Sequence, residues 1–145
     1  MPKIYVSHII PAAAAEVWDV IRDFNAMANW TDFVAESRIE QNLPSDQVGC
    51  IRNFTLRDGA RIREKLLSLS DYDMSFTYMI LDSPLGLENY VASLRLCPIT
   101  QNNQTFAEWT AEFTTAPGRE IQLAQFVSVN VFAAALTSLA AHVRG

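Results

Sequence analysis

The sequence predicts an α+β domain, in which seven largely antiparallel strands are segregated from the helices. Two observations predict this class. Residues 48–115 form a run of β-prone stretches joined by short, turn-prone connections. The last part of the chain, residues 117–143, has no proline after Pro117 and no glycine after Gly118, which indicates one long helix.

The elements are expected in the order strand, two helices, six strands and helix. Residues 3–9 alternate as a first strand that Pro11 ends, and residues 12–23 place apolar side chains at helical spacing. Residues 24–30 are expected to form a second, short helix. The remaining strands are expected at residues 33–41, 48–56, 60–69, 73–81, 87–97 and 104–115.

The C-terminal helix is expected to be roughly 38 Å long, which is enough to cross a small domain. Its apolar positions recur at spacings of three and four, and this stripe is expected to face the sheet: Phe126, Val129, Ala133, Leu136, Ala140 and Val143. Small residues such as Ala133 on this stripe have two interpretations. They either allow close packing or leave unfilled space beneath the helix.

Composition and charge exclude several classes of protein. The net charge is −5 and only two residues are lysines, which disfavours a nucleic-acid partner. No apolar run of about twenty residues is present, so we expect no membrane-spanning segment. The N-terminus lacks the pattern of a signal peptide, which predicts a cytoplasmic protein. Cys50 and Cys97 are isolated, which predicts free thiols and no metal site.

The length predicts a single domain over residues 1–145, as a monomer or a homodimer. Nothing in the sequence indicates a cofactor.

The stretch from Arg61 to Leu66 contains the most informative residue, Glu64. Strand alternation places Ile62, Glu64 and Leu66 on one face and the basic side chains on the other. Because the basic row belongs in water, Glu64 is expected to point inward. It is either a functional carboxylate or a structural one near the end of the sheet.

The partner of Glu64 follows from the turn at Arg57-Asp58-Gly59. A three-residue loop that ends in glycine would set Phe54 opposite Ile62 and Arg52 opposite Glu64, which matches apolar with apolar residues. We therefore expect an Arg52–Glu64 pair on the inner face. Direct contact with the guanidinium is expected to lower the pKa of Glu64 more than burial raises it.

Later strands add aromatic residues to the same face. Phe76, Tyr78 and Ile80 share one side of their strand, and Tyr90 and Trp109 are also expected to point inward. Such residues are either plain core or the wall of a cavity, and a buried tyrosine needs a hydrogen-bond partner. On the helix, the candidates are Phe126 and Ala133 on the stripe. Asn130 lies beside the stripe and could face the cavity or the solvent.

Several motifs in this order resemble the START/Bet v 1-like (SRPBCC) superfamily. They are IPAAAAEVWDVIRDFNAMANW, VGCIRNFTLRDGARIREKLLSL, LGLENYVASLRL and the terminal helix, which together span nearly the whole chain. The resemblance is to the polyketide cyclase/dehydrase-like branch and, more distantly, to plant abscisic-acid receptors. It implies a helix-grip fold, with a curved sheet wrapped around the C-terminal helix. It also implies a cavity for a lipid, hormone or polyketide.

The chain departs from the hormone receptors at three places. The short Arg57-Asp58-Gly59 turn stands where the receptors have a longer gate, and Leu85-Gly86-Leu87 replaces their latch. Ala35 falls at the position of the lysine that binds an acidic hormone. These differences disfavour a gated receptor for a carboxylate.

Two functions remain after this comparison. The first is binding of a small hydrophobic or amphipathic molecule that is lipid-, aromatic- or polyketide-like. The alternative is a polyketide cyclase or dehydratase in which Glu64 is the general acid/base and Arg52 holds it or an enolate. The first is favoured because no histidine or second inward carboxylate is expected near Glu64.

Overall fold

A computed structural model describes residues 2–144 of the chain. Seven strands are present, and their bounds are β1 (Lys3–Ile10), β2 (Val34–Ile39), β3 (Ile51–Leu56), β4 (Arg61–Ser70), β5 (Ser75–Asp82), β6 (Glu88–Ile99) and β7 (Gln104–Thr114). The helices are α1 (Ala14–Ile21), α2 (Met27–Trp30), the short 3-10 helix η1 (Glu40–Asn42), and the C-terminal α3 (Glu120–Phe126), η2 (Val127–Ala133) and α4 (Ala134–Arg144).

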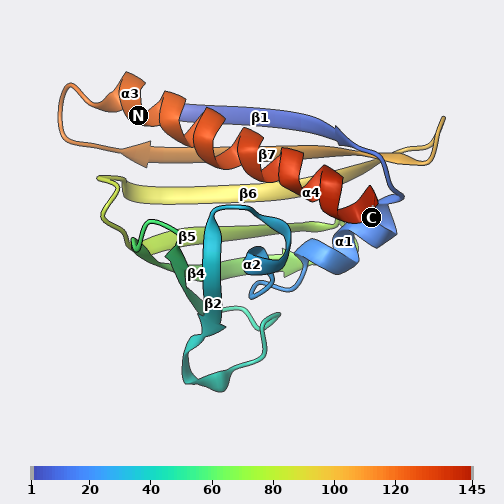
Figure 1. Cartoon of the computed structure of the whole chain (residues 1–145), viewed down its shortest axis with the longest axis horizontal. Coiled ribbons are helices and arrows are strands. Elements are labelled where there is room, and N and C mark those ends of the chain that lie inside the picture. Colours follow the sequence, from blue (N-terminus) through green and yellow to red (C-terminus); the bar gives the residue numbers. More distant parts are fainter. Residues whose placement is uncertain (1, 145) are drawn as a thin grey trace.

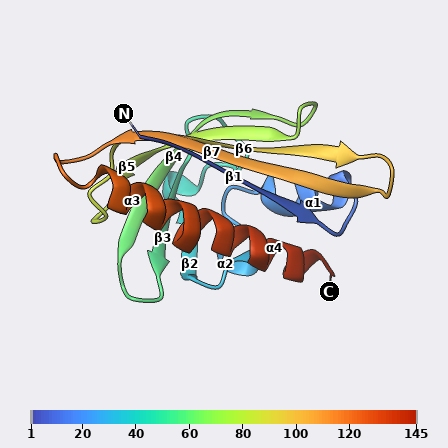
Figure 2. The ribbon, with the colours of Figure 1, turned by 90° about the horizontal axis from the view of Figure 1, so that it is seen from above.

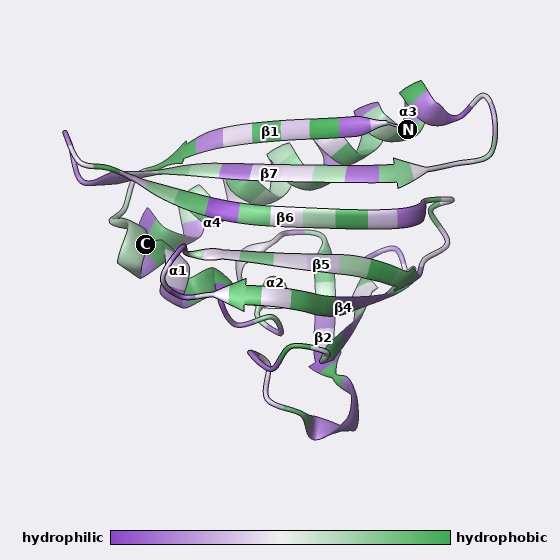
Figure 3. Cartoon of the chain, turned by 180° about the vertical axis from the view of Figure 1, so that it is seen from behind, coloured by the Kyte–Doolittle hydropathy of each residue, from purple (hydrophilic) through white to green (hydrophobic). Residues whose placement is uncertain are grey.

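The strands form one sheet in the order β1-β7-β6-β5-β4-β3-β2, and every neighbouring pair is antiparallel. The helices lie on one face of this sheet, and the C-terminal helix runs across it (Figures 1 and 2). The opposite face has no helix over it (Figure 3). The α+β helix-grip fold predicted from the sequence is confirmed.

Alternation along the strands builds the core between sheet and helices. In β7, Ala107, Trp109, Ala111 and Phe113 are buried whereas Thr110 and Glu112 are exposed. This pattern is typical of an antiparallel sheet that packs on a core through one face and meets solvent through the other. The predicted inward orientation of Trp109 is confirmed.

The first helix packs as its sequence pattern predicts. Its buried residues are Ala14, Val17, Trp18 and Ile21. Trp18 Nε1 donates a hydrogen bond of 2.8 Å to Asp71, and Arg22 Nε donates another to the same carboxylate. These bonds attach α1 to the β4–β5 turn. The second helix, α2, has only four residues and is shorter than predicted.

The predicted apolar stripe of the C-terminal helix is confirmed in α4, where Leu136 is buried and Ala140 and Val143 pack against the core, but it is wrong before α4. Phe126 and Val129 are 38% and 57% exposed, whereas the buried residues are Leu123, Val127, Phe132, Ala135, Leu136 and Leu139. The cause is η2, a π-helical segment. Val127 and Phe132 are five residues apart, which is the spacing of the i→i+5 hydrogen bonds in a π-helix. A stripe drawn with the α-helical period therefore does not follow the buried face through this segment.

The segment from Glu120 to Arg144 is long and apolar enough, by length and composition, to cross a membrane. In the structure it instead packs against the sheet through Leu123, Val127, Phe132 and Leu139. Its other side carries polar and small residues together with the exposed Ile121 and Val129. The apolar character of this segment is therefore explained by its packing as the C-terminal helix of the helix-grip fold.

Replacement of Phe132 by alanine tests the corrected face of the helix. Phe132 is fully buried and its ring stacks on Trp109 at a centroid distance of 4.2 Å. We expect Phe132→Ala to lower the free energy of unfolding by about 3–5 kcal/mol, measured by urea denaturation. The control Val129→Ala, at an exposed position of the predicted stripe, should change it by less than about 0.5 kcal/mol. Equal losses at both positions would contradict the π-helical register.

Candidate functional site

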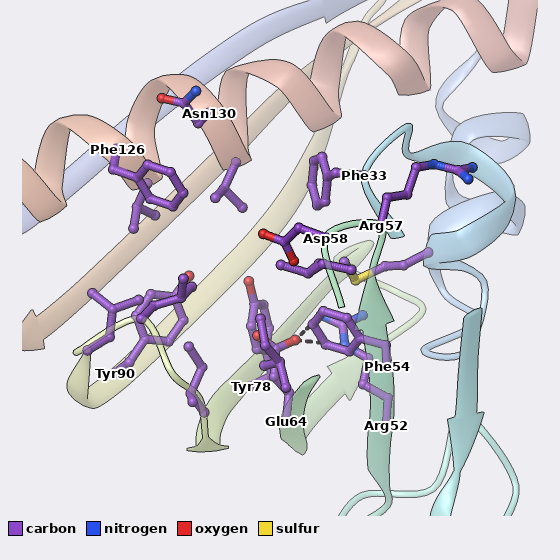
Figure 4. A pocket seen from close by; sticks show the side chains of 18 of the residues that line it. Phe33, Arg52, Phe54, Arg57, Asp58, Glu64, Tyr78, Tyr90, Phe126 and Asn130 are labelled. Carbon is purple, nitrogen blue, oxygen red and sulfur yellow. Dashed lines mark hydrogen bonds and ion pairs between the residues drawn. The ribbon is translucent and has the colours of Figure 1, made fainter. Parts of the chain in front are cut away.

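A cavity of about 450 Å³ lies between the inner face of the sheet and the C-terminal helix. Figure 4 shows its walls, with β3, β4, β5 and β6 on one side and Phe126 and Asn130 of the helix on the other. Ten of the twelve residues singled out in the sequence line it: Arg52, Phe54, Ile62, Glu64, Tyr78, Ile80, Tyr90, Trp109, Phe126 and Asn130. Asn130, whose orientation was left open, lines the cavity and is also exposed to solvent.

Phe76 and Ala133 were predicted to line the site, and the structure places both outside the cavity wall. Phe76 shares the inner face of β5, but its ring packs on Trp18 and Phe24 at centroid distances of 6.4 and 6.0 Å. It therefore belongs to the core beneath α1. Ala133 ends η2, and the π-helical register directs Val127 and Val131 of the same segment to the cavity instead.

The wall also contains residues that the sequence analysis did not select. They are Met27, Asp32, Phe33, Leu56, Arg57, Asp58, Leu85, Leu87, Val127 and Val131. Leu56 could have been found, because alternation in β3 places it on the face of Phe54. Leu87 could not, because the β6 pairing shifts between Glu88 and Val91, where Asn89 has a φ of 53°. This irregularity changes which residues point inward.

Three chain segments surround the mouth of the cavity. Arg57 joins the β3–β4 turn to the segment before β2: its Nε donates a hydrogen bond to the Asp32 carbonyl, and its amide donates to the Phe33 carbonyl at 2.9 Å. Ser138 of α4 donates to the Asp32 carboxylate at 3.0 Å. The mouth is therefore held by hydrogen bonds between segments that are distant in sequence.

The β5–β6 loop closes the cavity near the start of α3. Gly86 has a φ of 85°, and a Cβ atom added there would lie 2.6 Å from Arg119 Nη1. The glycine thus allows both the left-handed backbone and the close approach of Arg119. Leu85 and Leu87, on either side of this glycine, line the cavity.

Arg52 and Glu64 form a buried ion pair at the base of the cavity. They are opposed across β3 and β4, and Phe54 opposes Ile62, so the register predicted from the turn is confirmed. Arg52 Nε donates to Glu64 Oε1 at 2.8 Å, and Arg52 Nη2 lies 2.7 Å from the same oxygen (Figure 4). Their side chains are 3% and 7% exposed.

The guanidinium of Arg52 is enclosed by aromatic residues. Its central carbon lies 3.9 Å from the centroid of the Phe24 ring and 4.9 Å from that of Tyr78. Nη1 also donates a hydrogen bond of 3.3 Å to the Phe24 carbonyl. These contacts compensate part of the cost of removing the cation from water.

The pKa of Glu64 was predicted to be lowered, and this prediction is wrong. Burial of the carboxyl raises its pKa above the ordinary value, and the attraction and hydrogen bond of Arg52 oppose that rise without reversing it. Register alone indicated the partner but not how far both groups are removed from water.

Two tyrosines complete the polar end of the cavity. Trp109 Nε1 donates a hydrogen bond of 3.1 Å to the Tyr78 hydroxyl, and the Tyr78 and Tyr90 rings lie 6.2 Å apart. Burial raises the pKa of both phenols, and the neighbouring Glu64 raises it further. Both tyrosines therefore remain neutral hydrogen-bonding groups.

Among residues 2–144, no three histidine, cysteine, aspartate or glutamate side chains cluster closely enough to hold a metal ion. The two thiols, Cys50 and Cys97, are free, and Cys50 is buried. The buried polar groups of the cavity wall are thus an ion pair and two phenols, whereas Asp32, Arg57, Asp58 and Asn130 line it as exposed residues.

A comparison with protein-family models identifies the family. The model described as polyketide cyclase / dehydrase and lipid transport matches residues 1–144. The chain belongs to this family. No curated protein matches the chain significantly.

Several solved structures share this fold. XoxI from Bacillus cereus is 23% identical, with coverage of 97% of this chain and 94% of its own and a TM-score of 0.86. A protein from Thermobifida fusca is 26% identical, with coverage of 99% and 95% and a TM-score of 0.87. Ginseng major latex-like protein 151 from Panax ginseng is 11% identical, with coverage of 97% and 96% and a TM-score of 0.78.

Glu64 and Glu40 have pKa shifts of opposite sign. Their contributions to the free energy of unfolding should therefore depend on pH in opposite directions. Glu64 has a raised pKa, so the unfolded chain releases this proton first as the pH rises above about 4.3. The unfolding free energy of the wild type, minus that of Glu64→Gln, should therefore fall with rising pH. Urea denaturation from pH 3 to 7 measures this difference.

Glu40 is the matched control. Hydrogen bonds from Arg63 lower its pKa to about 2, so its stabilisation is present above about pH 4.3 and is lost as the pH falls toward that lower value. The difference between the wild type and Glu40→Gln should therefore rise with pH. If the Glu64→Gln difference rises as well, Arg52 outweighs burial and the raised pKa is contradicted.

Proposed function

We propose that this protein binds a small hydrophobic or amphipathic molecule in the cavity between the sheet and the C-terminal helix. The observation that carries the proposal is the cavity itself, which has an apolar wall and one polar end. A volume of about 450 Å³ lies within the range of small-molecule sites. A lipid-, aromatic- or polyketide-like ligand would place its apolar body against this wall.

The residues divide the cavity into two chemical regions. Phe54, Ile62 and Ile80 from the sheet and Val127 and Val131 from the helix offer only apolar surface. Burial of a ligand against them would contribute about 25 cal/mol per Å² of apolar surface removed from water. The ion pair and the two tyrosines would then orient the ligand by its polar group.

The family description supports a role of this kind, because it names both lipid transport and polyketide chemistry. The same fold can host a binding protein or an enzyme, so the choice depends on the residues of the site. We further propose a cytoplasmic monomer or homodimer that needs no cofactor, as expected from the sequence.

Blocking the cavity tests the proposal. Val131 lines the cavity from the helix, and we expect Val131→Trp to weaken binding of the neutral dye N-phenyl-1-naphthylamine by at least tenfold. The new side chain would fill empty space, so the unfolding free energy should change little. Fluorescence titration and urea denaturation measure the two quantities.

The matched control is Val129→Trp, which adds the same side chain at a position 57% exposed to solvent. It should leave dye affinity unchanged. If the Val131→Trp variant instead keeps its dye affinity and loses about 1–3 kcal/mol of stability, the region is a dense core and the binding proposal fails.

A second candidate function is catalysis by a polyketide cyclase or dehydratase. The specific observation in its favour is Glu64, a carboxyl group in the cavity wall whose pKa burial raises. Glu64 would act as the general acid/base, Arg52 would hold it in place, and Tyr78 and Tyr90 would orient the substrate. Against it stands the lack of a histidine among the described residues that line the cavity.

Native mass spectrometry of protein purified from its own host distinguishes the two functions. A binding protein should retain a small molecule whose mass stays constant on prolonged incubation. An enzyme should change the mass of added polyketide-like compounds, and Glu64→Gln should slow that conversion at least a hundredfold. Conversion that is unaffected by Glu64→Gln would contradict the assigned role of Glu64.

A further inference from the structure

We infer that the cavity selects an uncharged ligand that donates a hydrogen bond, such as a phenol or alcohol, to Oε2 of Glu64. This inference rests on the proposed binding function and names the class of ligand for that site. It follows from which donors and acceptors of Arg52, Glu64 and Tyr78 already have partners within the protein.

Arg52 has little capacity left for a ligand. Nε and Nη2 contact Glu64, Nη1 donates to the Phe24 carbonyl, and the Phe24 ring lies against the guanidinium. A carboxylate ligand would therefore find the charge of Arg52 already compensated by Glu64, and the other arginine in the wall, Arg57, is exposed to solvent. Such a ligand would instead approach Glu64, and two like charges in a buried site repel each other.

Glu64 has an acceptor left for a ligand. All of its hydrogen bonds and ion-pair contacts with residues 2–144 go to Oε1, and the side chain lines the cavity. Because Arg52 keeps its positive charge, a neutral Glu64 would leave a buried cation without compensation. The pair geometry therefore favours the carboxylate form, in which Oε2 can only accept.

The tyrosines suit the same ligand group. The Tyr78 oxygen accepts from Trp109, which leaves its own proton to donate, and the Tyr90 side chain lines the cavity beside it. A ligand hydroxyl could donate to Glu64 Oε2 and accept from a tyrosine, and so complete the network.

A cationic donor fits less well than a neutral one. The Arg52–Glu64 pair has no net charge, so an ammonium group buried beside it would lose its hydration without a compensating anion. An uncharged hydroxyl meets the free acceptor without that cost.

The test uses four compounds that share one ring system: 9-phenanthrol, 9-methoxyphenanthrene, phenanthrene and phenanthrene-9-carboxylate. Fluorescence titrations at pH 7 give their dissociation constants. With the wild type, we expect 9-phenanthrol to bind at least tenfold more tightly than the other three, since a hydrogen bond to a charged group contributes this much or more.

The Glu64→Gln variant provides a reversal that a merely structural role would not produce. Its Oε1 can still accept from Arg52, but an amide donor replaces the acceptor Oε2. We expect 9-phenanthrol to lose its advantage and 9-methoxyphenanthrene to bind at least as tightly. The comparison of ligands on the wild type stands even if this variant fails to fold.

The outcomes separate this inference from the proposed function. If none of the compounds binds, or if Val131→Trp binds them as well as the wild type does, the cavity is not the site and both proposals fail. If Val131→Trp abolishes binding but the ether or the carboxylate binds the wild type as tightly as the phenol, only this inference is overturned. A preference for the phenol that persists in Glu64→Gln overturns it equally.

Discussion

The structure depends on one geometric constraint: a single long helix has to cover the inner face of a seven-stranded sheet. Strands lie about 4.8 Å apart, so seven of them span roughly 29 Å, whereas a helix with its side chains is only about 10–12 Å across. The helix alone cannot cover that face. Curvature of the sheet, the short helices α1 and α2 and the aromatic rings beneath them cover one part, and the cavity occupies the rest.

The ion pair determines the chemistry of that remaining space. Arg52 and Glu64 are buried together, and Phe24, Tyr78 and a backbone carbonyl surround the guanidinium. Replacing such a pair with apolar residues is often neutral or stabilising, so burial of the charges is weak evidence for a role in stability alone. Because the pair lies in the wall of the cavity, it supports the recognition role that we propose.

The family and the site favour the same kind of function by separate routes. The family model covers nearly the whole chain and describes lipid transport as well as polyketide chemistry. The site adds an apolar wall, an arginine paired with a carboxylate that has one free oxygen, and two neutral phenols. This combination is suited to holding and orienting an uncharged molecule, and Glu64 is its one buried carboxyl group among the described residues.

The sequence by itself determined the features that depend on local periodicity. Alternation in β3 and β4 and a three-residue turn were sufficient to place Arg52 opposite Glu64, because a register shift of one residue would move every side chain to the other face. The strand order along the chain and the existence of the C-terminal helix followed from the same kind of pattern. Eight of the nine residues selected on the strands line the cavity for this reason.

Only the tertiary structure decided the features that depend on how segments pack. The π-helical segment moved the buried face of the helix from Val129 and Ala133 to Val127 and Phe132, and an irregularity at Asn89 accompanies the placement of Leu87 in the wall. The mouth joins loops that are distant in sequence, and the pKa of Glu64 depends on how completely the fold excludes water. Hydrophobic periodicity carries no information about these arrangements, because they arise from contacts between elements and not within them.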